Sequence, residues 1–189
     1  MNNTQNKETA TFAGGCFWCF EAIFKRLKGI ESVTSGYSGG NPPAGGENPT
    51  YEKLHSQNTG YAEAVQIVFD PAIISYQKLL EVFFHLHDPT TLNKQGNDIG
   101  EEYRSIIFYN SEKQKRLAQS SKEEAQKMYK DLIVTAIEPY KNFYKAEPHH
   151  QNYYDRNKDA PYCRFVIDPK IKKLYKEFKD DVKENPESM

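Results

Sequence analysis

The 189-residue sequence predicts an α+β fold in which helices pack on a mixed sheet. Residues 62–69 alternate apolar and polar side chains as a half-buried strand does, whereas residues 16–28 and 169–178 repeat apolar side chains with helical spacing. Strand and helix patterns follow one another irregularly, with no internal repeat and no interdomain linker. We therefore expect one domain over residues 9–189, preceded by a flexible N-terminus over residues 1–8.

Capping and turn residues set the boundaries of the expected elements. Ser75 can cap a helix that ends before Asp88 and Pro89, and Ser111 with Gln114 fits a capping box. In chain order we expect a strand at 9–13, a helix at 16–28, a Gly/Pro-rich loop at 35–46, a strand at 62–69, a helix from 75 to 87, a strand at 104–109, a helix at 111–128, a strand at 132–137, a short helix at 149–155, a strand at 163–167 and a final helix from Pro169.

The composition excludes several classes of protein. With 25 Lys and Arg against 26 Asp and Glu, the net charge of −1 gives no electrostatic reason to expect a nucleic-acid or membrane-surface binder. The 13 Tyr, 11 Phe and 1 Trp predict a core together with an aromatic-lined site. The 3 Cys do not fit a secreted disulfide scaffold, and no targeting segment or bilayer-length apolar run is present. We expect a cytoplasmic protein whose thiols stay reduced.

The strongest local signal is the run Gly-Gly-Cys-Phe-Trp-Cys at residues 14–19, between the first strand and the first helix. Cys16 would lie at the helix N-terminus, where unpaired N–H groups and the helix dipole lower a thiol pKa. Cys19 follows one turn later and can reach Cys16, as in Cys-x-x-Cys redox pairs. The alternative is a pair of small buried residues without a chemical role.

A zinc site is a rival explanation for these thiols. Cys16, Cys19 and Cys163 with either His149 or His150 would make a Cys3His set. Two bulky rings between the paired cysteines, at the start of a helix, argue against a knuckle that wraps a metal. We therefore expect no bound metal and no cofactor.

Glu63 is the second informative residue. On the alternating strand it shares a face with Val65, Ile67 and Phe69, which places a carboxyl group among core side chains. Burial raises a carboxyl pKa, so Glu63 could hold a proton at neutral pH and donate it. The alternative is a strand-end Glu that turns back to solvent.

Several ordered motifs together resemble the peptide methionine sulfoxide reductase A family. Each motif is short, but they occur in order over residues 9–167, nearly the whole expected domain, which is far more specific than a single pattern. They are Gly15-Cys16-Phe17-Trp18 with Glu21, Gly36-Tyr37-Ser38-Gly39-Gly40, Asn48-Pro49-Thr50-Tyr51, Gly60-Tyr61-Ala62-Glu63-Ala64-Val65, His87-Asp88-Pro89, Gln95-Gly96-Asn97-Asp98, Tyr103-Arg104-Ser105 and the region of His150-Gln151.

The resemblance implies a two-layer α+β sandwich on a ferredoxin-like core, and a single catalytic domain. It implies that methionine-S-sulfoxide, free or in proteins, is reduced to methionine. Cys16 resembles the family nucleophile, and Phe17 and Trp18 resemble the rings around the methyl group of the substrate. After attack, Cys16 would be left as a sulfenic acid, which a second thiol converts to a disulfide that thioredoxin reduces.

The resemblance also implies a polar set around the sulfoxide oxygen. Glu63 matches the acid, Tyr51 and Tyr103 match two phenol donors, and Asp98 matches a supporting polar residue. Taken alone, each tyrosine could equally be a core ring with a solvated hydroxyl, and Asp98 could belong to an ordinary turn. A neutral acid with two phenols suits a polar, uncharged substrate whose oxygen must receive a proton.

The resolving thiol is the point at which this sequence departs from a common family pattern. Many members carry Gly where Cys19 stands, and carry recycling cysteines in a Gly-rich tail that this chain lacks. Cys163 is the alternative, although the following residues predict a strand that would hold it in place. We favour Cys19, because it lies one helical turn from Cys16. Direct reduction of the sulfenic acid by an external thiol is a third route. A general thiol–disulfide oxidoreductase and a zinc or peptide-binding module are the competing functions.

Overall fold

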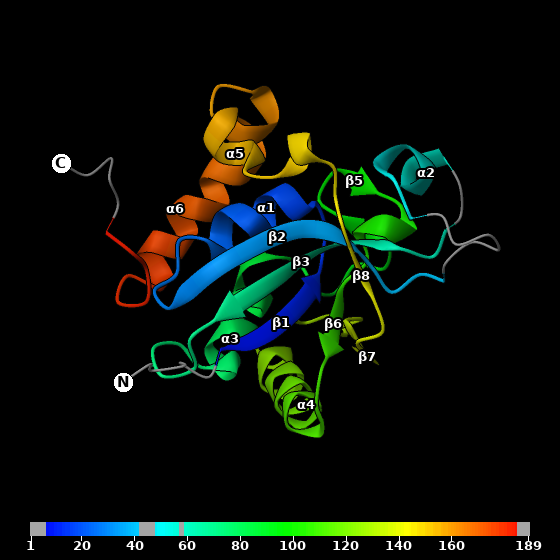
Figure 1. Ribbon diagram of the computed structural model, residues 1–189. Helices are drawn as coiled ribbons and strands as arrows, with labels where there is room; N and C mark the ends of the chain where they lie inside the picture. The colour runs from blue at the N-terminus through cyan, green and yellow to red at the C-terminus, as the bar shows by residue number, and fades with distance from the viewer. Residues whose placement is uncertain (1–6, 42–47, 57–58, 185–189) are drawn as a thin grey trace, which may run out of the picture.

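A six-stranded sheet, in the order β7-β6-β1-β3-β2-β8, forms the centre of the computed structural model, which describes residues 7–41, 48–56 and 59–184 (Figure 1). β6 and β7 are parallel and the other neighbours are antiparallel, so the sheet is mixed and the α+β prediction is confirmed. Its strands are β1 (Glu8–Ala13), β2 (Ile30–Ser38), β3 (Ala62–Phe69), β6 (Ile106–Tyr109), β7 (Ala136–Pro139) and β8 (Phe143–Lys145).

The helices and the remaining short elements connect these strands. Ser75 accepts a hydrogen bond from the Lys78 N–H, and Ser111 accepts one from the Gln114 N–H, so both predicted caps are confirmed. The elements are α1 (Phe17–Phe24), α2 (Tyr51–Ser56), α3 (Tyr76–Leu86), β4 (Lys94–Gln95), β5 (Asp98–Ile99), η1 (Glu101–Tyr103), α4 (Glu112–Gln126), η2 (Pro148–His150), α5 (Tyr153–Arg156), η3 (Cys163–Ile167) and α6 (Asp168–Glu177).

The sheet separates two apolar clusters, and β3 contributes to both. Val65, Ile67 and Phe69 belong to the larger cluster, in which the Phe12 ring of β1 lies 5.7 Å from Phe24 of α1 and 5.1 Å from Phe83 of α3. Alternate residues of β3 belong to the smaller cluster with Ile106 and Phe108. Because side chains alternate along a strand, Glu63 lies on the face that the helices cover.

Two strands of the central sheet, β2 and β8, were not expected, because their sequences carry weak strand signals, and the short hairpin of β4 and β5 was not expected either. The predicted loop at 35–46 is wrong at its start, where residues 35–38 belong to β2 and pair with β3 and β8. Residues 42–47 of that loop lie outside the described residues. Gly36 allows β8 to approach, because a Cβ atom there would lie 2.4 Å from the Tyr144 carbonyl oxygen.

The predicted strand at 163–167 is wrong. These residues form η3, a π-helical turn that continues directly into α6. Cys163 and Ile167 are fully buried four residues apart, and Ile171 and Leu174 continue the same buried face, whereas Phe165 is 80% exposed. The burial follows helical rather than strand spacing, so the β-branched residues here pack as one side of a helix.

Other boundaries differ by a few residues. The expected strand at 132–137 begins only at Ala136, because the Val134 N–H donates to the Pro89 carbonyl instead of a neighbouring strand. The expected helix at 149–155 is divided into η2 and α5. Residues 1–6 of the expected N-terminal segment lie outside the described residues, and β1 starts at Glu8. Across the described part of the chain, no helix has the length and apolar character needed to span a membrane.

Candidate active site

Cys16 lies at the N-cap of α1, directly after β1 and its two glycines. Gly15 has a φ of +108°, and a Cβ atom there would come within 2.5 Å of Gln95 Cγ, so the turn requires glycine. This tight turn leads the chain from the end of β1 to the start of α1, where it places the Cys16 thiol. The Cys16 side chain is nearly buried, with the residue 7% exposed.

A cavity of 220 Å³ brings together the predicted site residues from five separate parts of the chain. The predicted residues extend from Cys16 to Tyr103 along the sequence, yet the fold places them around one hollow. Its lining residues are Cys16, Phe17, Trp18, Tyr51, Glu63, Asp98, Tyr103 and Tyr162. Tyr162 was not among the predicted site residues.

Glu63 is buried within the site, as the strand pattern predicts. It is 2% exposed, and its Oε2 accepts the Phe17 N–H at 3.0 Å. Its Oε1 lies 3.4 Å from His55 Nε2. Burial raises the pKa of Glu63, and the hydrogen bonds from His55 and the Phe17 N–H reduce this effect without reversing it. Glu63 is therefore suited to hold a proton at neutral pH.

The two cysteines of α1 share a hydrogen bond that separates their pKa values. Burial and the hydrogen bond to Cys19 raise the pKa of Cys16 well above its usual range, and the negative charge of Glu63 adds to this effect when that carboxyl is ionised. The hydrogen bond from Cys16 lowers the pKa of Cys19 to about 7. The expectation of a lowered pKa at Cys16 is therefore wrong, because burial beside a carboxyl group outweighs the helix terminus. The shared hydrogen bond therefore favours the proton on Cys16 and the negative charge on Cys19.

Tyr162 connects Cys19 to Asp98. Its hydroxyl lies 2.8 Å from Asp98 Oδ2 and 3.8 Å from Cys19 Sγ, and it can donate its single proton to either acceptor. Asp98 reaches the site from the short hairpin of β4 and β5. Burial raises the pKa of Tyr162, so the phenol keeps its proton beside the thiols.

Aromatic rings form one wall of the cavity. The Trp18 ring is stacked on Tyr153 at 3.6 Å between centroids, and its Nε1–H donates to His150 Nδ1 at 3.2 Å. Phe17 is 1% exposed and packs 5.2 Å from the ring of His150 and 5.9 Å from that of Tyr37. These contacts fix the orientation of both predicted pocket rings.

The two predicted phenols remain protonated donors. Burial, followed by the charge of Glu63, raises the pKa of Tyr51 to about 12, and the same causes raise the pKa of Tyr103. The Tyr51 ring lies between two imidazoles, 4.1 Å from His55 and 4.5 Å from His150 by centroids. The backbone N–H of Tyr51 donates a hydrogen bond to Glu147 Oε1 at 2.9 Å.

Cys163 lies apart from the cavity lining. It is fully buried in the core and its pKa is raised by burial. All cysteines are free thiols. Within residues 7–41, 48–56 and 59–184, no group of three or more His, Cys, Asp or Glu side chains is arranged to hold a metal ion, so nothing here favours the zinc alternative.

Tyr162 and His55 were missed by the sequence analysis, because they reach the site only through the fold and no local pattern marks them. His150 and Glu21 belong to the motifs quoted above, but neither was assigned a role in the site. Glu21 follows the cysteine motif closely. It is 2% exposed and its Oε1 accepts the Asn152 N–H at 2.9 Å, which ties the segment bearing His150 and Tyr153 to α1. A glutamate among the apolar residues of the predicted helix could have indicated that Glu21 is buried and needs a hydrogen-bond partner.

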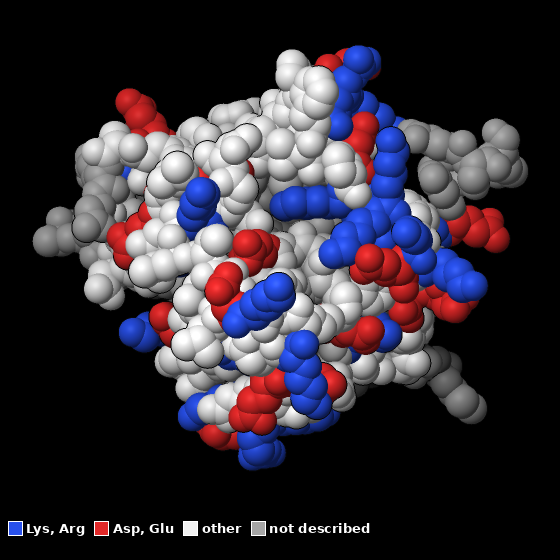
Figure 2. All heavy atoms as spheres, turned by 180° about the vertical axis from the view of Figure 1, so that it is seen from behind, with Lys and Arg blue, Asp and Glu red and all other residues white. Residues whose placement is uncertain are grey.

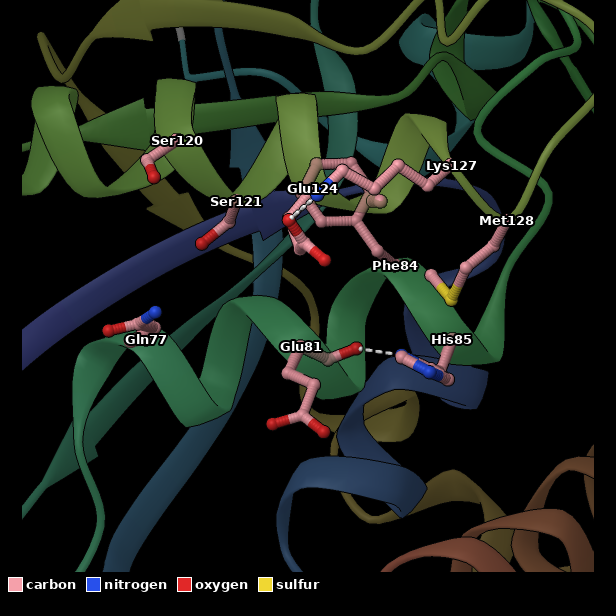
Figure 3. Close-up of a pocket in the computed structure, with 10 residues that line it drawn as sticks. Gln77, Glu81, Phe84, His85, Ser120, Ser121, Glu124, Lys127 and Met128 are labelled. Atoms are coloured by element: carbon pink, nitrogen blue, oxygen red, sulfur yellow. Dashed lines mark hydrogen bonds and ion pairs between the residues drawn. The ribbon is translucent and has the colours of Figure 1, made fainter.

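A larger hollow of 500 Å³ lies between α3 and α4 (Figure 3). Glu81, Glu124 and Lys127 line it together with Met128, and the dashed line marks the 2.8 Å hydrogen bond between His85 Nδ1 and the Glu81 carbonyl. It contains no thiol or phenol. In the rear view of Figure 2, acidic and basic side chains lie next to one another, in agreement with the net charge of −1.

Comparison with known proteins gives consistent matches over nearly the whole chain. The profile described as peptide methionine sulfoxide reductase matches residues 8–182. The peptide methionine sulfoxide reductase MsrA of Sulfolobus acidocaldarius is 53% identical over 173 residues, which cover 92% of this chain and 96% of that protein. Reduced Mxr1 from Saccharomyces cerevisiae has a TM-score of 0.80 at 35% identity, covering 86% of this chain and 92% of that one. Mxr1 in complex with Trx2 gives 0.56 at 29% identity, covering 81% and 88%.

Proposed function

Because the chain belongs to the peptide methionine sulfoxide reductase family, we propose that its 220 Å³ cavity reduces methionine-S-sulfoxide, with Cys16 as the nucleophile and Glu63 as the acid. The observation that carries the assignment is the juxtaposition of Cys16 with a buried Glu63, whose pKa is raised by burial, in one aromatic-walled cavity, with Cys19 hydrogen-bonded to Cys16 behind it. The family acts on free and peptide-bound residues, and the S epimer is its substrate.

The cavity recognises a neutral sulfoxide by its two ends. Phe17 and Trp18 offer apolar contact to the methyl group, and a fit at the level of one methylene contributes about 1–3 kcal/mol of selectivity. Tyr51 and Tyr103 supply O–H donors for the sulfoxide oxygen, as protonated phenols. The carboxyl proton of Glu63 completes this donor set.

In the first step the sulfoxide is reduced and Cys16 is oxidised. The Cys16 sulfur attacks while its proton passes to the Cys19 thiolate, and Glu63 gives its proton to the sulfoxide oxygen. The sulfur–oxygen bond breaks, and the oxygen ends on Cys16 as a sulfenic acid. The substrate sulfur gains two electrons and Cys16 loses two. Methionine, a Cys19 thiol and a Glu63 carboxylate result, with atoms and charge balanced.

In the second step Cys19 resolves the sulfenic acid. Its sulfur bonds to Cys16, and its proton leaves with the hydroxyl group as water. Tyr162, beside Cys19 Sγ, is placed to orient this attack. Cys19 is the stronger candidate because its side chain hydrogen-bonds to Cys16, whereas burial raises the pKa of Cys163.

A thioredoxin dithiol then reduces the disulfide and restores both thiols. The Mxr1 relative in complex with Trx2 supports this choice of reductant. We further infer a ferredoxin-like core, which the element order β1-α1-β2-β3-α3-β6 and the strand order β6-β1-β3-β2 support. We also propose that residues 9–189 act as a single catalytic domain, and that the chain works in the cytoplasm, because its chemistry requires reduced thiols.

The test is an assay of the purified protein with dithiothreitol and each methionine sulfoxide epimer separately. We expect consumption of the S epimer, and no activity from Cys16→Ser. The proposal fails if neither epimer is consumed, or if Cys16→Ser keeps full activity. Insulin reduction that does not depend on Glu63 would instead favour a general thiol–disulfide oxidoreductase.

A further inference from the structure

His55 links the buried Glu63 to a second hollow at the surface. One ring nitrogen, Nε2, lies 3.4 Å from Glu63 Oε1, and the other, Nδ1, lies 3.0 Å from Glu102 Oε1. The side chains of Glu63, His55 and Glu102 are 2%, 24% and 16% exposed, so the chain of contacts leads from the interior to solvent. In Figure 1, α2, which carries His55, lies beside β5 at the same end of the sheet.

The reaction cavity and a neighbouring surface groove lie on either side of His55, and His55 lines only the groove. Glu63 lines the reaction cavity of 220 Å³, and His55 does not. His55 and Glu102 line a neighbouring groove of 370 Å³ with Glu101 and Tyr61. The imidazole therefore forms the contact between the acid in the cavity and the water-accessible groove.

Each turnover leaves Glu63 without its proton. In the proposed first step this proton goes to the sulfoxide oxygen. The later steps leave Cys19 as a thiol and Glu63 as a carboxylate, so before the next cycle Cys19 releases one proton to solvent and Glu63 takes one up. Direct access of water is poor, because Glu63 is 2% exposed. Among the described residues, the groups that hydrogen-bond to its carboxyl are the Phe17 N–H and His55, and an amide does not release its proton.

We propose that His55, held by Glu102, is a relay that returns a proton from the groove to Glu63 in every catalytic cycle. The protonated imidazole passes the proton on Nε2 to the Glu63 carboxylate, and water in the groove supplies the next one. The Glu102 carboxylate stabilises the imidazolium that forms. This inference rests on the proposed function, since it assigns His55 a role through Glu63 and not through the substrate.

The surroundings of His55 favour this role. Its hydrogen bond to Glu63 raises the pKa of His55, and that to Glu102 acts in the same direction, so the imidazolium is available near neutral pH. Several titratable and charged groups of the described residues face His55 or its carboxylate partner Glu63. They are Cys16 at the start of α1, Tyr37 from β2, Tyr51 from α2, Glu63 from β3, Asp98 from β5, Glu102 and Tyr103 from η1, and His150 from η2.

The experiment compares first-turnover and multiple-turnover rates of His55→Gln, whose amide can still hold Glu63 but cannot carry a proton. Methionine formed by the reduced enzyme without reductant gives the first turnover. Dithiothreitol, raised until the rate no longer increases, gives multiple turnover. We expect the first turnover within about twofold of the wild type, because Glu63 starts protonated, and multiple turnover about tenfold slower. Added imidazole should restore the rate.

Two further variants make the outcome specific. Glu102→Gln should show the same defect in a smaller form, whereas His85→Gln, on the far helix α3, should match the wild type. The rates are compared between pH 6 and 9, about the range in which imidazole titrates. A multiple-turnover rate of His55→Gln equal to that of the wild type over this range would overturn the relay. A slowed first turnover that imidazole does not rescue would also overturn it, since His55 would then only position Glu63. If the wild type forms no methionine in its first turnover, the proposed function fails instead.

Discussion

The reaction cavity and the hollow between α3 and α4 differ in how their polar groups are held. In the larger hollow, 500 Å³, side chains pair with near neighbours in the sequence, as His85 does with the Glu81 carbonyl four residues away and Lys127 does with Glu124. In the 220 Å³ cavity the contacts join residues 46 positions apart for Phe17 and Glu63, and 132 for Trp18 and His150. The polar side chains of the smaller hollow are therefore held by long-range contacts, and burial there raises the pKa values of Cys16, Glu63 and Tyr103.

The most damaging change should be Glu63→Gln, which keeps the size of the side chain and an acceptor for the Phe17 N–H but removes the acidic proton. We expect kcat for S-sulfoxide reduction to fall by about 10²–10⁴, the usual contribution of a general acid. Thermal unfolding of the variant should remain close to that of the wild type. A loss of less than about threefold would remove Glu63 from its role as acid.

Cys19→Ser should abolish turnover supported by thioredoxin, because the sulfenic acid on Cys16 has no partner. The first turnover should also slow, because Cys16 loses the base that takes its proton. In the wild type the first-turnover rate should rise with pH through about 7, as the Cys19 thiolate forms, and fall at higher pH as Glu63 loses its proton. Rapid-quench measurements between pH 5 and 9 check both limbs.

The matched comparison is Cys163→Ser, which should keep the thioredoxin-supported rate. If Cys163→Ser loses this rate and Cys19→Ser keeps it, the assignment of the resolving thiol is reversed. A pH profile of Cys19→Ser that retains the rise near 7 would show that another group is the base.

Tyr51→Phe and Tyr103→Phe should have intermediate effects. Each removes one O–H donor from the proposed oxygen site while keeping the ring. A single hydrogen bond of about 1–1.5 kcal/mol corresponds to a loss of about five- to tenfold in kcat/KM. The double variant should lose more than either single variant, and an unchanged kcat/KM in both would place the sulfoxide oxygen elsewhere.

The smallest effect should come from the larger hollow. Ser121→Ala and His85→Gln alter its lining without touching the cavity. We expect kcat/KM within about twofold of the wild type for both, since surface substitutions rarely have large effects. A loss of activity comparable to that of the tyrosine variants would mean that the two hollows are coupled, against the comparison above.

Local patterns predicted the parts of the molecule whose signals lie within a few residues of one another. The strand at 62–69 and the cap at Ser75 follow from spacing and side-chain chemistry alone. The turn at Gly14-Gly15-Cys16 is likewise predicted by two glycines that stand between a strand pattern and a helix pattern. The site residues that the family resemblance implied line one cavity. They could be predicted for the same reason, because each belongs to a recognisable motif.

The misses have physical causes. Residues 163–167 combine β-branched and aromatic side chains, which favour strands, but burial of Cys163 and Ile167 against α1 selects a helical turn. The sequence places His55 eight residues before Glu63 without any sign that they meet, because α2 and β3 are brought together only in the fold. The pKa order of Cys16 and Cys19 depends on burial and on the Glu63 charge, which no local pattern contains.

Peptide mass mapping after one equivalent of methionine-S-sulfoxide tests the central claim most directly. Reduced protein would react in the absence of other thiols, followed by alkylation of the remaining cysteines and proteolysis. The account predicts a Cys16–Cys19 disulfide with Cys163 alkylated, in proportion to the methionine released. A Cys16–Cys163 disulfide with Cys19 alkylated would contradict it.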